Sequence, residues 1–245
     1  MADTDGLSDV IWMRPQPARR TVQPPLSRDQ ITAAALAVAD AEGVGAVTMR
    51  RIAQHLGCGT MSLYRHVRNK DELLELMVDA AVGEEEPRTG SPGGWQEDLR
   101  ALARAKRAVM LRHPWLAPLM AGRPVLGPHV VESIERSLSA VDGLGLSVDE
   151  MVRCFNTLNA FVNGFVQTEL EERKWRRPVS GDDSDAARDT WQHRTGPYLE
   201  HLVDSGRYPL FSRMVNEAES YPDPDEAFEW QLQRVLDGLA TALPE

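Results

Sequence analysis

Apolar residues recur at helical spacing along most of this chain, beginning near residue 27. A capping box at 27–30 opens the first such segment, because a Ser hydroxyl and a Gln side chain three positions later can each satisfy a free backbone N–H group. The apolar stripe that follows consists of Ile31, Ala34, Ala35, Val38 and Ala41. Similar stripes come later, and no segment alternates as a strand would. The pattern predicts an all-α protein of about nine to ten helices.

A stretch of unusually short predicted helices comes next. Thr48 can cap a helix that ends at Gly57, and a second short helix spans about residues 60–66. Asn69 can cap the longer helix after it. Two short helices joined by a glycine-containing turn predict a helix-turn-helix within residues 27–82.

The flanking segments differ in composition from this head. Residues 1–26 contain four prolines and three arginines, which predicts a flexible basic arm. Residues 83–94 (GEEEPRTGSPGG) are rich in turn-forming residues and mark a domain boundary. Helical patterns resume at Trp95, so we expect a larger helical bundle over residues 95–245.

Composition narrows the class of protein. Of the 245 residues, 42% are hydrophobic, which is sufficient for a packed core. No apolar run approaches the roughly 20 residues of a membrane-spanning helix, and the N-terminus lacks the features of a secretory signal. Cys58 and Cys154 stand far apart without a paired-cysteine motif. We therefore expect a cytoplasmic protein with no metal site and no membrane partner.

Charge is distributed unevenly along the chain. The formal net charge is −10, yet residues 14–82 carry nine Lys and Arg against seven Asp and Glu. The window from Gly43 to Lys70 contains no Asp or Glu, although it contains four arginines and two histidines. A carboxylate-free basic segment on an acidic protein indicates contact with a polyanion. The alternative is a surface hairpin with a solvated basic face.

The second short helix has the composition that reading DNA requires. Leu63 and Val67 share a face that would enter the core. The positions left to face outward are Thr60, Met61, Ser62, Tyr64, Arg65 and His66. A helix in the major groove needs hydrogen-bonding and small apolar groups for base edges, flanked by cations and hydroxyls for phosphates. We therefore predict that this helix binds double-stranded DNA.

The segment TMRRIAQHLGCGTMSLYRHVRNKDELLELM resembles the DNA-binding head of tetracycline-repressor (TetR/AcrR) regulators. Shared features are Thr-x-Arg-x-Ile-Ala, the Leu-Gly turn, Leu-Tyr-x-His and the following Asn-Lys, and the match covers about residues 27–80. The resemblance implies a homodimeric regulator, a repressor that a small-molecule effector releases from a palindromic operator.

The residue types and the resemblance together suggest roles within the head. The DNA-contacting candidates are Thr48 and Arg50 on the supporting helix, Tyr64, His66 and Lys70 at phosphates, and Thr60, Met61, Ser62 and Arg65 at base edges. Lys70 would add a cation where a helix N-terminus already favours phosphate. Met61 and Arg65 differ from the residues of the family's namesake, so its operator sequence does not carry over to this chain.

An amide stripe runs along the long helix predicted over 147–175. Its members are Asn156, Asn159, Asn163 and Gln167. Buried amides must be hydrogen-bonded, and a mostly apolar cavity with a few polar groups is the usual small-molecule site. The candidate effector-binding residues are Met110, His113, Trp115, Phe155, Asn159, Phe161, Asn163 and Phe165. The alternatives are a hydrogen-bond network between helices and an exposed polar face.

Two apolar stripes are suited to a four-helix dimer interface, one on the helix near 147–175 and one on the helix near 224–243. The second stripe consists of Phe228, Leu232, Val235, Leu239 and Ala242. Packing within one chain fits both stripes equally well, and the family resemblance favours the dimer.

The resemblance is weaker in the bundle than in the head. It includes Gly-Trp-Gln at 94–96 and Gly-Arg-Pro at 122–124. Leu102, Lys106 and Leu119 stand where the namesake has ligand-contacting or metal-binding residues, so a magnesium–tetracycline complex is not the effector that we expect.

An enzyme is the main alternative from another class. The sequence holds no G-x-S-x-G, P-loop, HExxH or paired-cysteine motif, and His193 and His201 are eight positions apart. We expect neither catalysis nor a cofactor, with a helical lyase or transferase as the alternative. An effector-free architectural DNA-binding protein is a further alternative, which the large acidic body disfavours.

Overall fold

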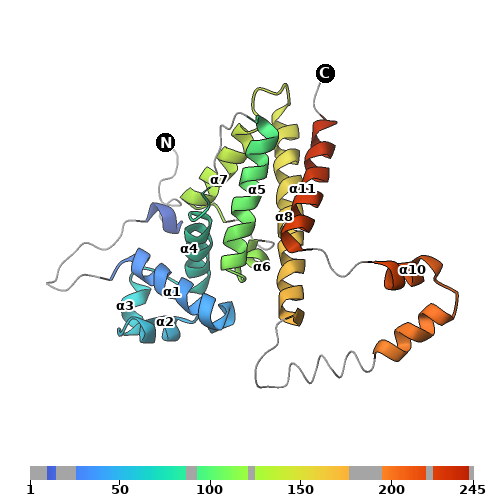
Figure 1. Ribbon diagram of the computed structural model, residues 1–245. Helices are drawn as coiled ribbons and strands as arrows, with labels where there is room; N and C mark the ends of the chain where they lie inside the picture. The colour runs from blue at the N-terminus through green and yellow to red at the C-terminus, as the bar shows by residue number, and fades with distance from the viewer. Residues whose placement is uncertain are drawn as a thin grey trace. The chain divides into compact units, whose positions relative to one another are not determined.

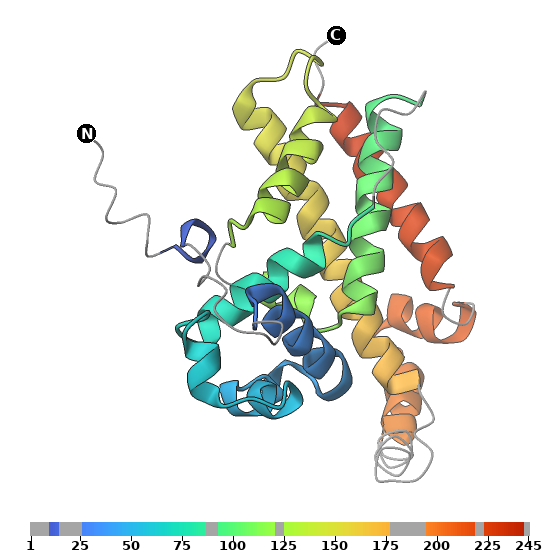
Figure 2. The ribbon, with the colours of Figure 1, turned by 90° about the vertical axis from the view of Figure 1, so that its left-hand side faces the viewer.

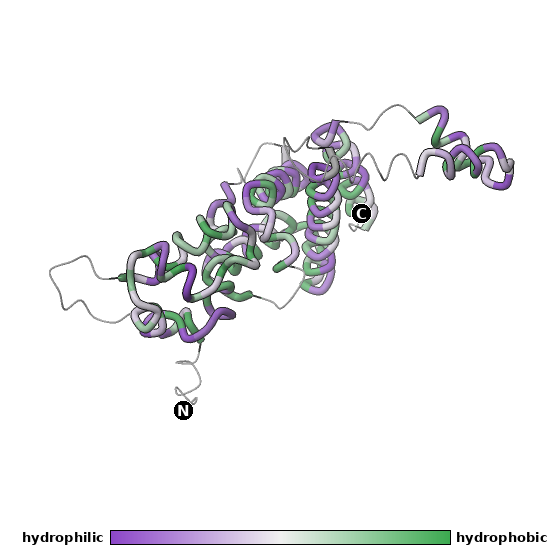
Figure 3. The backbone as a smooth tube through the Cα atoms, turned by 90° about the horizontal axis from the view of Figure 1, so that it is seen from below, coloured by the Kyte–Doolittle hydropathy of each residue, from purple (hydrophilic) through white to green (hydrophobic). Residues whose placement is uncertain are grey.

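The computed structural model describes residues 10–14, 26–86, 93–120, 125–176, 195–218 and 223–242. These ranges are predominantly helical and contain no strand, which confirms the predicted all-α class (Figure 1). Apolar and polar residues are interspersed along the helices (Figure 3). None of the helices in this part of the chain is long and apolar enough to cross a membrane.

The N-terminal head contains the predicted short helices. Its helices are α1 (Arg28–Glu42), α2 (Met49–His55), α3 (Thr60–Tyr64) and α4 (Lys70–Val82), with a 3₁₀ turn, η3 (Val44–Ala46), between α1 and α2. Ser27 forms the predicted capping box with Gln30. Thr48, which is exposed, and Asn69 cap α2 and α4 through their side-chain oxygens, as predicted. Each cap satisfies a backbone N–H that the first helical turn leaves free.

The remaining helices form the body. They are α5 (Trp95–Arg112), α6 (Leu116–Met120), α7 (Pro128–Ser139), α8 (Val148–Arg176), α10 (Pro209–Glu217) and α11 (Pro224–Ala240), and residues 195–204 are also helical. The backbone N–H groups of Glu150 in α8 and Asp225 in α11 donate to side-chain oxygens of Ser147 and Asp223. Both starts agree with the helices predicted near 147–175 and 224–243.

Two compact units make up the chain, residues 1–167 together with 234–245, and residues 168–233. The predicted domains 27–82 and 95–245 stay a prediction. Helix α4 of the head packs against α5, α6 and α7 inside the first unit. Figures 1 and 2 show α4 extending from the α1–α3 group toward α7.

Helix α4 joins the head to the body through apolar packing and one buried carboxylate. Leu73 and Met77 are fully buried. Asp79 is only 2% exposed. Its Oδ1 accepts a hydrogen bond from the Val130 N–H at 3.0 Å, and its Oδ2 lies 2.8 Å from His129 Nδ1. Asp79 therefore caps the N-terminus of α7 from another helix.

The apolar stripe of α11 is partly used inside one chain. Phe228 and Leu232 are fully buried, whereas Val235 and Leu239 are half-buried. Trp230, which lies outside the predicted stripe, is 65% exposed. Packing within one chain therefore accounts for Phe228 and Leu232, and the exposed apolar surface of α11 lies elsewhere on the helix.

Candidate DNA interface and effector cavity

Helix α3 is fixed in the head by the turn before it and the buried residues on its back. Gly57 in the turn has a φ of +64°, a left-handed conformation that glycine adopts without strain. The helix ends at Tyr64 rather than at the predicted residue 66. The chain tightens there, because the N–H groups of His66 and Val67 both bond the Leu63 carbonyl, at 2.9 and 3.0 Å. Leu63 and Val67 are fully buried, as predicted.

Two predicted base-edge candidates, Met61 and Arg65, and the predicted phosphate contact Tyr64 are exposed at α3. Met61 is 72% exposed and Tyr64 is 45% exposed. Arg65, at the C-cap, is also exposed, whereas Thr60 and Ser62 are half-buried. A short helix with a buried back and an exposed polar front is the surface that enters a major groove.

Three of the predicted DNA-contacting cations form no ion pair with a carboxylate of the described residues. Arg50, Arg65 and Lys70 are exposed, and none has an ion-pair partner among the described residues. Arg51 differs, because it binds both carboxylate oxygens of Glu42 at 2.6–3.3 Å.

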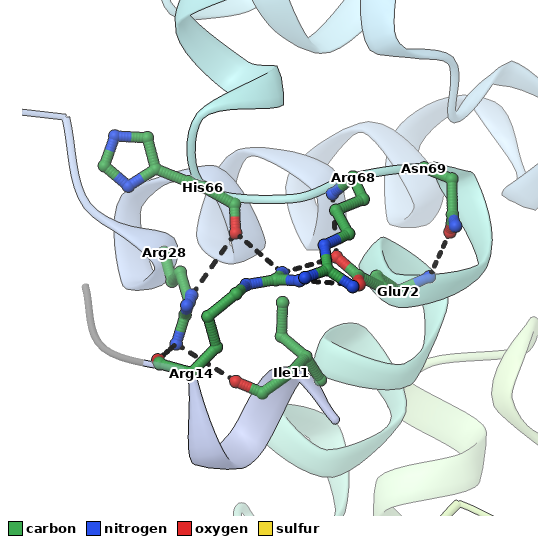
Figure 4. A network of polar contacts seen from close by, with 7 residues as sticks. All are labelled: Ile11, Arg14, Arg28, His66, Arg68, Asn69 and Glu72. Carbon is green, nitrogen blue, oxygen red and sulfur yellow. Dashed lines mark hydrogen bonds and ion pairs between the residues drawn. The ribbon is translucent and has the colours of Figure 1, made fainter. Parts of the chain in front are cut away.

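His66 is placed differently from the other predicted phosphate contacts. The residue is 8% exposed, and its ring points away from the neighbouring polar network (Figure 4). Burial lowers the pKa of the imidazole, and Arg28 and Arg65 lower it further. Arg14 Nη2 and Arg28 Nε each donate to the main-chain carbonyl of His66 at 3.3 Å. It is the carbonyl of His66, rather than its ring, that joins the network.

Residues 10–14 form a strap that packs against the head beside the end of α3 (Figure 4). The strap contains a 3₁₀ turn, η2 (Ile11–Met13), and Ile11 is 1% exposed. Arg28 Nη1 donates to the Ile11 carbonyl at 3.1 Å and to the Arg14 carbonyl at 2.7 Å. The strap lies within the segment 1–26, for which sequence reasoning predicted only a flexible arm.

Glu72 connects the strap to the start of α4. The Arg14 guanidinium donates to both Glu72 oxygens, at 3.0 and 2.6 Å. The Arg68 N–H donates to Glu72 Oε2 at 2.7 Å. Burial alone would raise the pKa of the Glu72 carboxyl, but the hydrogen bonds from Arg14 and the Arg68 N–H hold it below its usual value. The network ties the strap, the carbonyl after α3 and the first turn of α4 together.

A second polar cluster links α1 to the junction of α5 and α6. His113 Nδ1 lies 2.8 Å from Asp40 Oδ1, and the Trp115 Nε1–H donates to the same oxygen at 2.7 Å. His113 Nε2 lies 3.2 Å from Glu84 Oε2, which also accepts from Arg112. His113 and Trp115, predicted to line the effector cavity, therefore contact the head.

A small cavity of about 10 Å³ in the body is bounded by residues of α5, α7 and α8 and by Glu85, which follows α4. Its apolar lining includes Leu102, Phe155, Leu158 and Val162, and its polar lining includes Glu85, Lys106, Ser133 and Asn159. Phe155 and Asn159 belong to the set of predicted effector-binding residues. Sequence reasoning did not assign Lys106 or Glu85 to the cavity.

The other predicted effector-binding residues lie outside this lining. Met110 is 1% exposed. The rings of Phe161 and Phe165 have centroids 6.0 Å apart, and Phe165 faces the Arg107 guanidinium. The Oδ1 atom of Asn163 is buried and has no hydrogen-bond partner among the described residues. An unpaired buried amide oxygen is rare in proteins.

Two segments of the chain match known protein families. Residues 31–77 match the bacterial regulatory proteins of the tetR family, and residues 86–243 match the tetracyclin repressor-like C-terminal domain. The chain belongs to the tetR family. The first match lies in the head of this tetR-family chain, and the second covers most of its body.

Named regulators align with most of the chain. The HTH-type transcriptional repressor DrrR1 of Streptomyces coeruleorubidus is 36% identical over 244 residues, covering 97% of this chain and 88% of that protein. The class E tetracycline repressor protein of Escherichia coli is 30% identical over 222 residues, covering 90% of this chain and 93% of that protein. This tetR-family chain is a DNA-binding transcriptional repressor.

Solved structures of the family share the fold. Apo ActR from Streptomyces coelicolor matches with a TM-score of 0.72 and 30% identity, over 89% of this chain and 96% of that chain. ActR in complex with (S)-DNPA matches with a TM-score of 0.72 and 31% identity, over 90% of this chain and 100% of that chain. A further ActR structure contains actinorhodin. ActR is therefore a tetR-family relative that binds small molecules in its crystal structures.

Proposed function

We propose that this repressor binds a palindromic operator as a homodimer and leaves it when a small-molecule effector binds to the body. The observation that carries the DNA role is the surface of α3. Leu63 and Val67 hold its back in the core, while Met61, Tyr64 and Arg65 face solvent in a window without carboxylates.

The exposed residues divide by the part of DNA that their chemistry suits. Thr60, Met61, Ser62 and Arg65 would meet base edges, and an arginine can bind a guanine through two hydrogen bonds. Tyr64, Arg50 and Lys70 would bind phosphates, with Thr48 beside them at the start of α2. His66 would act mainly through the position of its carbonyl, because its ring is buried.

Exposed apolar side chains on α8 and α11 support the dimer. Val148 and Val152 on α8 are 73% and 40% exposed, and Trp230 on α11 is 65% exposed. Apolar surface on helices that the family resemblance assigns to an interface favours burial against a second copy. The two heads of such a dimer would read half-sites roughly 34–36 Å apart.

A physical route from the body to the head supports release by an effector. Helix α5 belongs to the body, and His113, directly after α5, contacts Asp40 in the head. A shift of α5 would therefore reach α1. A coupling free energy of about 1–3 kcal/mol between the two sites is typical of such regulators. The ligand-bound structures of ActR support this proposal.

Footprinting of the intergenic DNA beside the repressor's own gene tests the proposal. We expect two protected half-sites whose protection weakens steeply as salt rises, because phosphate contacts release counterions. Absence of salt-sensitive protection there and at other candidate palindromes would contradict the DNA role. A helical enzyme would instead show turnover that survives deletion of residues 1–82.

A further inference from the structure

Met61 places an apolar side chain on the otherwise polar surface that faces DNA. It is 72% exposed, whereas Met49, the other methionine between residues 43 and 70, is 9% exposed and belongs to the core. The structure describes every residue of this range, and the exposed large apolar side chains within it are those of Met61 and Tyr64. Met61 therefore contributes little to the packing of the head.

The surroundings of Met61 leave its side chain open to another molecule. Gly59, directly before α3, has no side chain, and a Cβ at that position would meet no atom within 4 Å. Thr60 and Ser62, the sequence neighbours of Met61, are half-buried. Among the first three residues of α3, Met61 is thus the exposed one, and this end of a recognition helix meets base edges.

The major groove offers one apolar partner to such a side chain. Base edges there present hydrogen-bond donors and acceptors, apart from the C5-methyl group of thymine. A thioether is only a weak hydrogen-bond acceptor, so it gains little from a polar edge. Contact with a methyl group instead removes apolar surface of both partners from water.

We propose that Met61 reads a thymine in each half-site of the operator, through contact between its side chain and the C5-methyl group of that base. The inference rests on the proposed binding of DNA by α3. It assigns a base and a chemical contact to one of the four base-edge candidates.

Helix geometry relates this thymine to the base that Arg65 would read. Met61 and Arg65 are four positions apart and therefore share one face of the helix. Arg65 retains a helical backbone at the C-cap, with a φ of −71° and a ψ of −24°. Four residues advance an α-helix by about 6 Å, and successive base pairs are roughly 3.4 Å apart, so the two bases lie within about two base pairs of each other.

Replacing single thymines of the footprinted operator by uracil tests the inference, because uracil pairs as thymine does and lacks only the C5-methyl group. Fluorescence anisotropy with the full-length protein and synthetic operator duplexes measures the affinities. Uracil at the contacted thymine of both half-sites should weaken binding about fifteenfold, since burial of one methyl group contributes about a factor of four in each half-site. Uracil between the half-sites should leave the affinity unchanged.

Met61→Ala removes the contact without touching the core, so this variant should bind the thymine and uracil operators equally well. Met214→Ala is the matched control, because Met214 is also exposed, at 56%, but lies on α10 in the other compact unit. We expect Met214→Ala to keep the full preference for thymine.

Three results would overturn the Met61 inference while leaving the DNA role intact. They are an operator with no uracil-sensitive thymine, an undiminished preference in Met61→Ala, and a sensitive thymine remote from the base pair whose preference Arg65→Ala relaxes. A protein that protects no operator at all would contradict the proposed function and overturn this inference with it.

Discussion

Tyr64 and Arg65 are neighbours at the exposed end of α3, but we expect different chemistry from them. Arg65→Ala should relax the preference for one base pair in each half-site by about 1–3 kcal/mol, because a two-pronged contact to guanine is lost. Tyr64→Phe should weaken binding about equally across operator variants, because a hydroxyl on a phosphate carries no sequence information. Competition binding against single-base operator variants measures both effects.

The assignment of Arg65 to a base edge has a clear failing outcome. If Arg65→Ala weakens all operator variants equally, its guanidinium binds phosphate instead. Measurements repeated over a series of salt concentrations would then show a smaller salt dependence of binding, because one phosphate contact is lost.

Glu72 gives a prediction whose sign is unusual for a DNA-binding head. Removing a carboxylate from such a head ordinarily strengthens binding, because repulsion of phosphates falls. Glu72→Gln should instead weaken operator binding by roughly tenfold, or about 1.4 kcal/mol. Arg14 and the Arg68 N–H both donate hydrogen bonds to this carboxylate, next to the end of α3. Loss of these bonds should therefore disturb the position of α3. Fluorescence anisotropy with labelled operator is a suitable measurement.

Asp71→Asn is the control for Glu72→Gln. Asp71 is exposed and adjacent in the same first turn of α4. We expect Asp71→Asn to leave affinity unchanged or to strengthen it slightly. If both substitutions strengthen binding, the strap network has no role in positioning α3.

Among whole elements, α7 begins at a place where only a glycine fits. A Cβ on Gly127 would lie 2.2 Å from Asp79 Oδ1, although its φ of −72° suits any residue. Gly127→Ala should therefore lower the free energy of unfolding by about 1–3 kcal/mol through steric displacement of α7 or α4. Urea unfolding followed by circular dichroism measures the change.

Gly45→Ala serves as the comparison, because no atom lies within 4 Å of the Cβ position there. Its effect should remain within about 0.5 kcal/mol. A Gly127→Ala protein as stable as the Gly45→Ala protein would mean that α4 and α7 are not packed as closely as the structure places them.

Helix starts were predictable because capping is local. The caps at Ser27, Thr48 and Asn69 each need only a side chain and an N–H three residues away. The end of α3 was less predictable, because its last turn tightens onto the Leu63 carbonyl without a sequence signal.

The parts of the site that the sequence missed depend on contacts between distant segments. Arg14 meets Glu72 across 58 positions, and Trp115 meets Asp40 across 75. The only local hint of the strap was a run of four apolar residues, Val10 to Met13, among polar and proline residues. Lys106 was noticed as a departure from the family's namesake, but its place in the cavity depends on α8 packing beside α5.

At the scale of the whole molecule, DNA binding must work against a net charge of −10. Only the head has an acid-free basic window, so a few phosphate contacts should account for the salt dependence. Lys70→Gln should reduce the slope of log affinity against log salt by about 2 in a homodimer, one for each copy. Filter binding over a series of salt concentrations measures the slope. A reduction of about 1 would indicate that one head binds at a time, and no reduction would exclude a phosphate contact by Lys70.

The carboxylates of Asp40 and Asp79 also limit how such regulators can be recombined. Both residues belong to the head in sequence, yet their partners, Trp115, His113 and His129, belong to the body. A head grafted from a relative would leave the buried side chains of Trp115 and His113 and the buried Val130 N–H unpaired unless it brought a carboxylate to both positions, at a cost of about 1–3 kcal/mol for each buried group. A hybrid repressor joins the head of one regulator to the body of another. Its two parents should therefore be chosen first for carboxylates at the positions of Asp40 and Asp79, and only then for overall sequence identity.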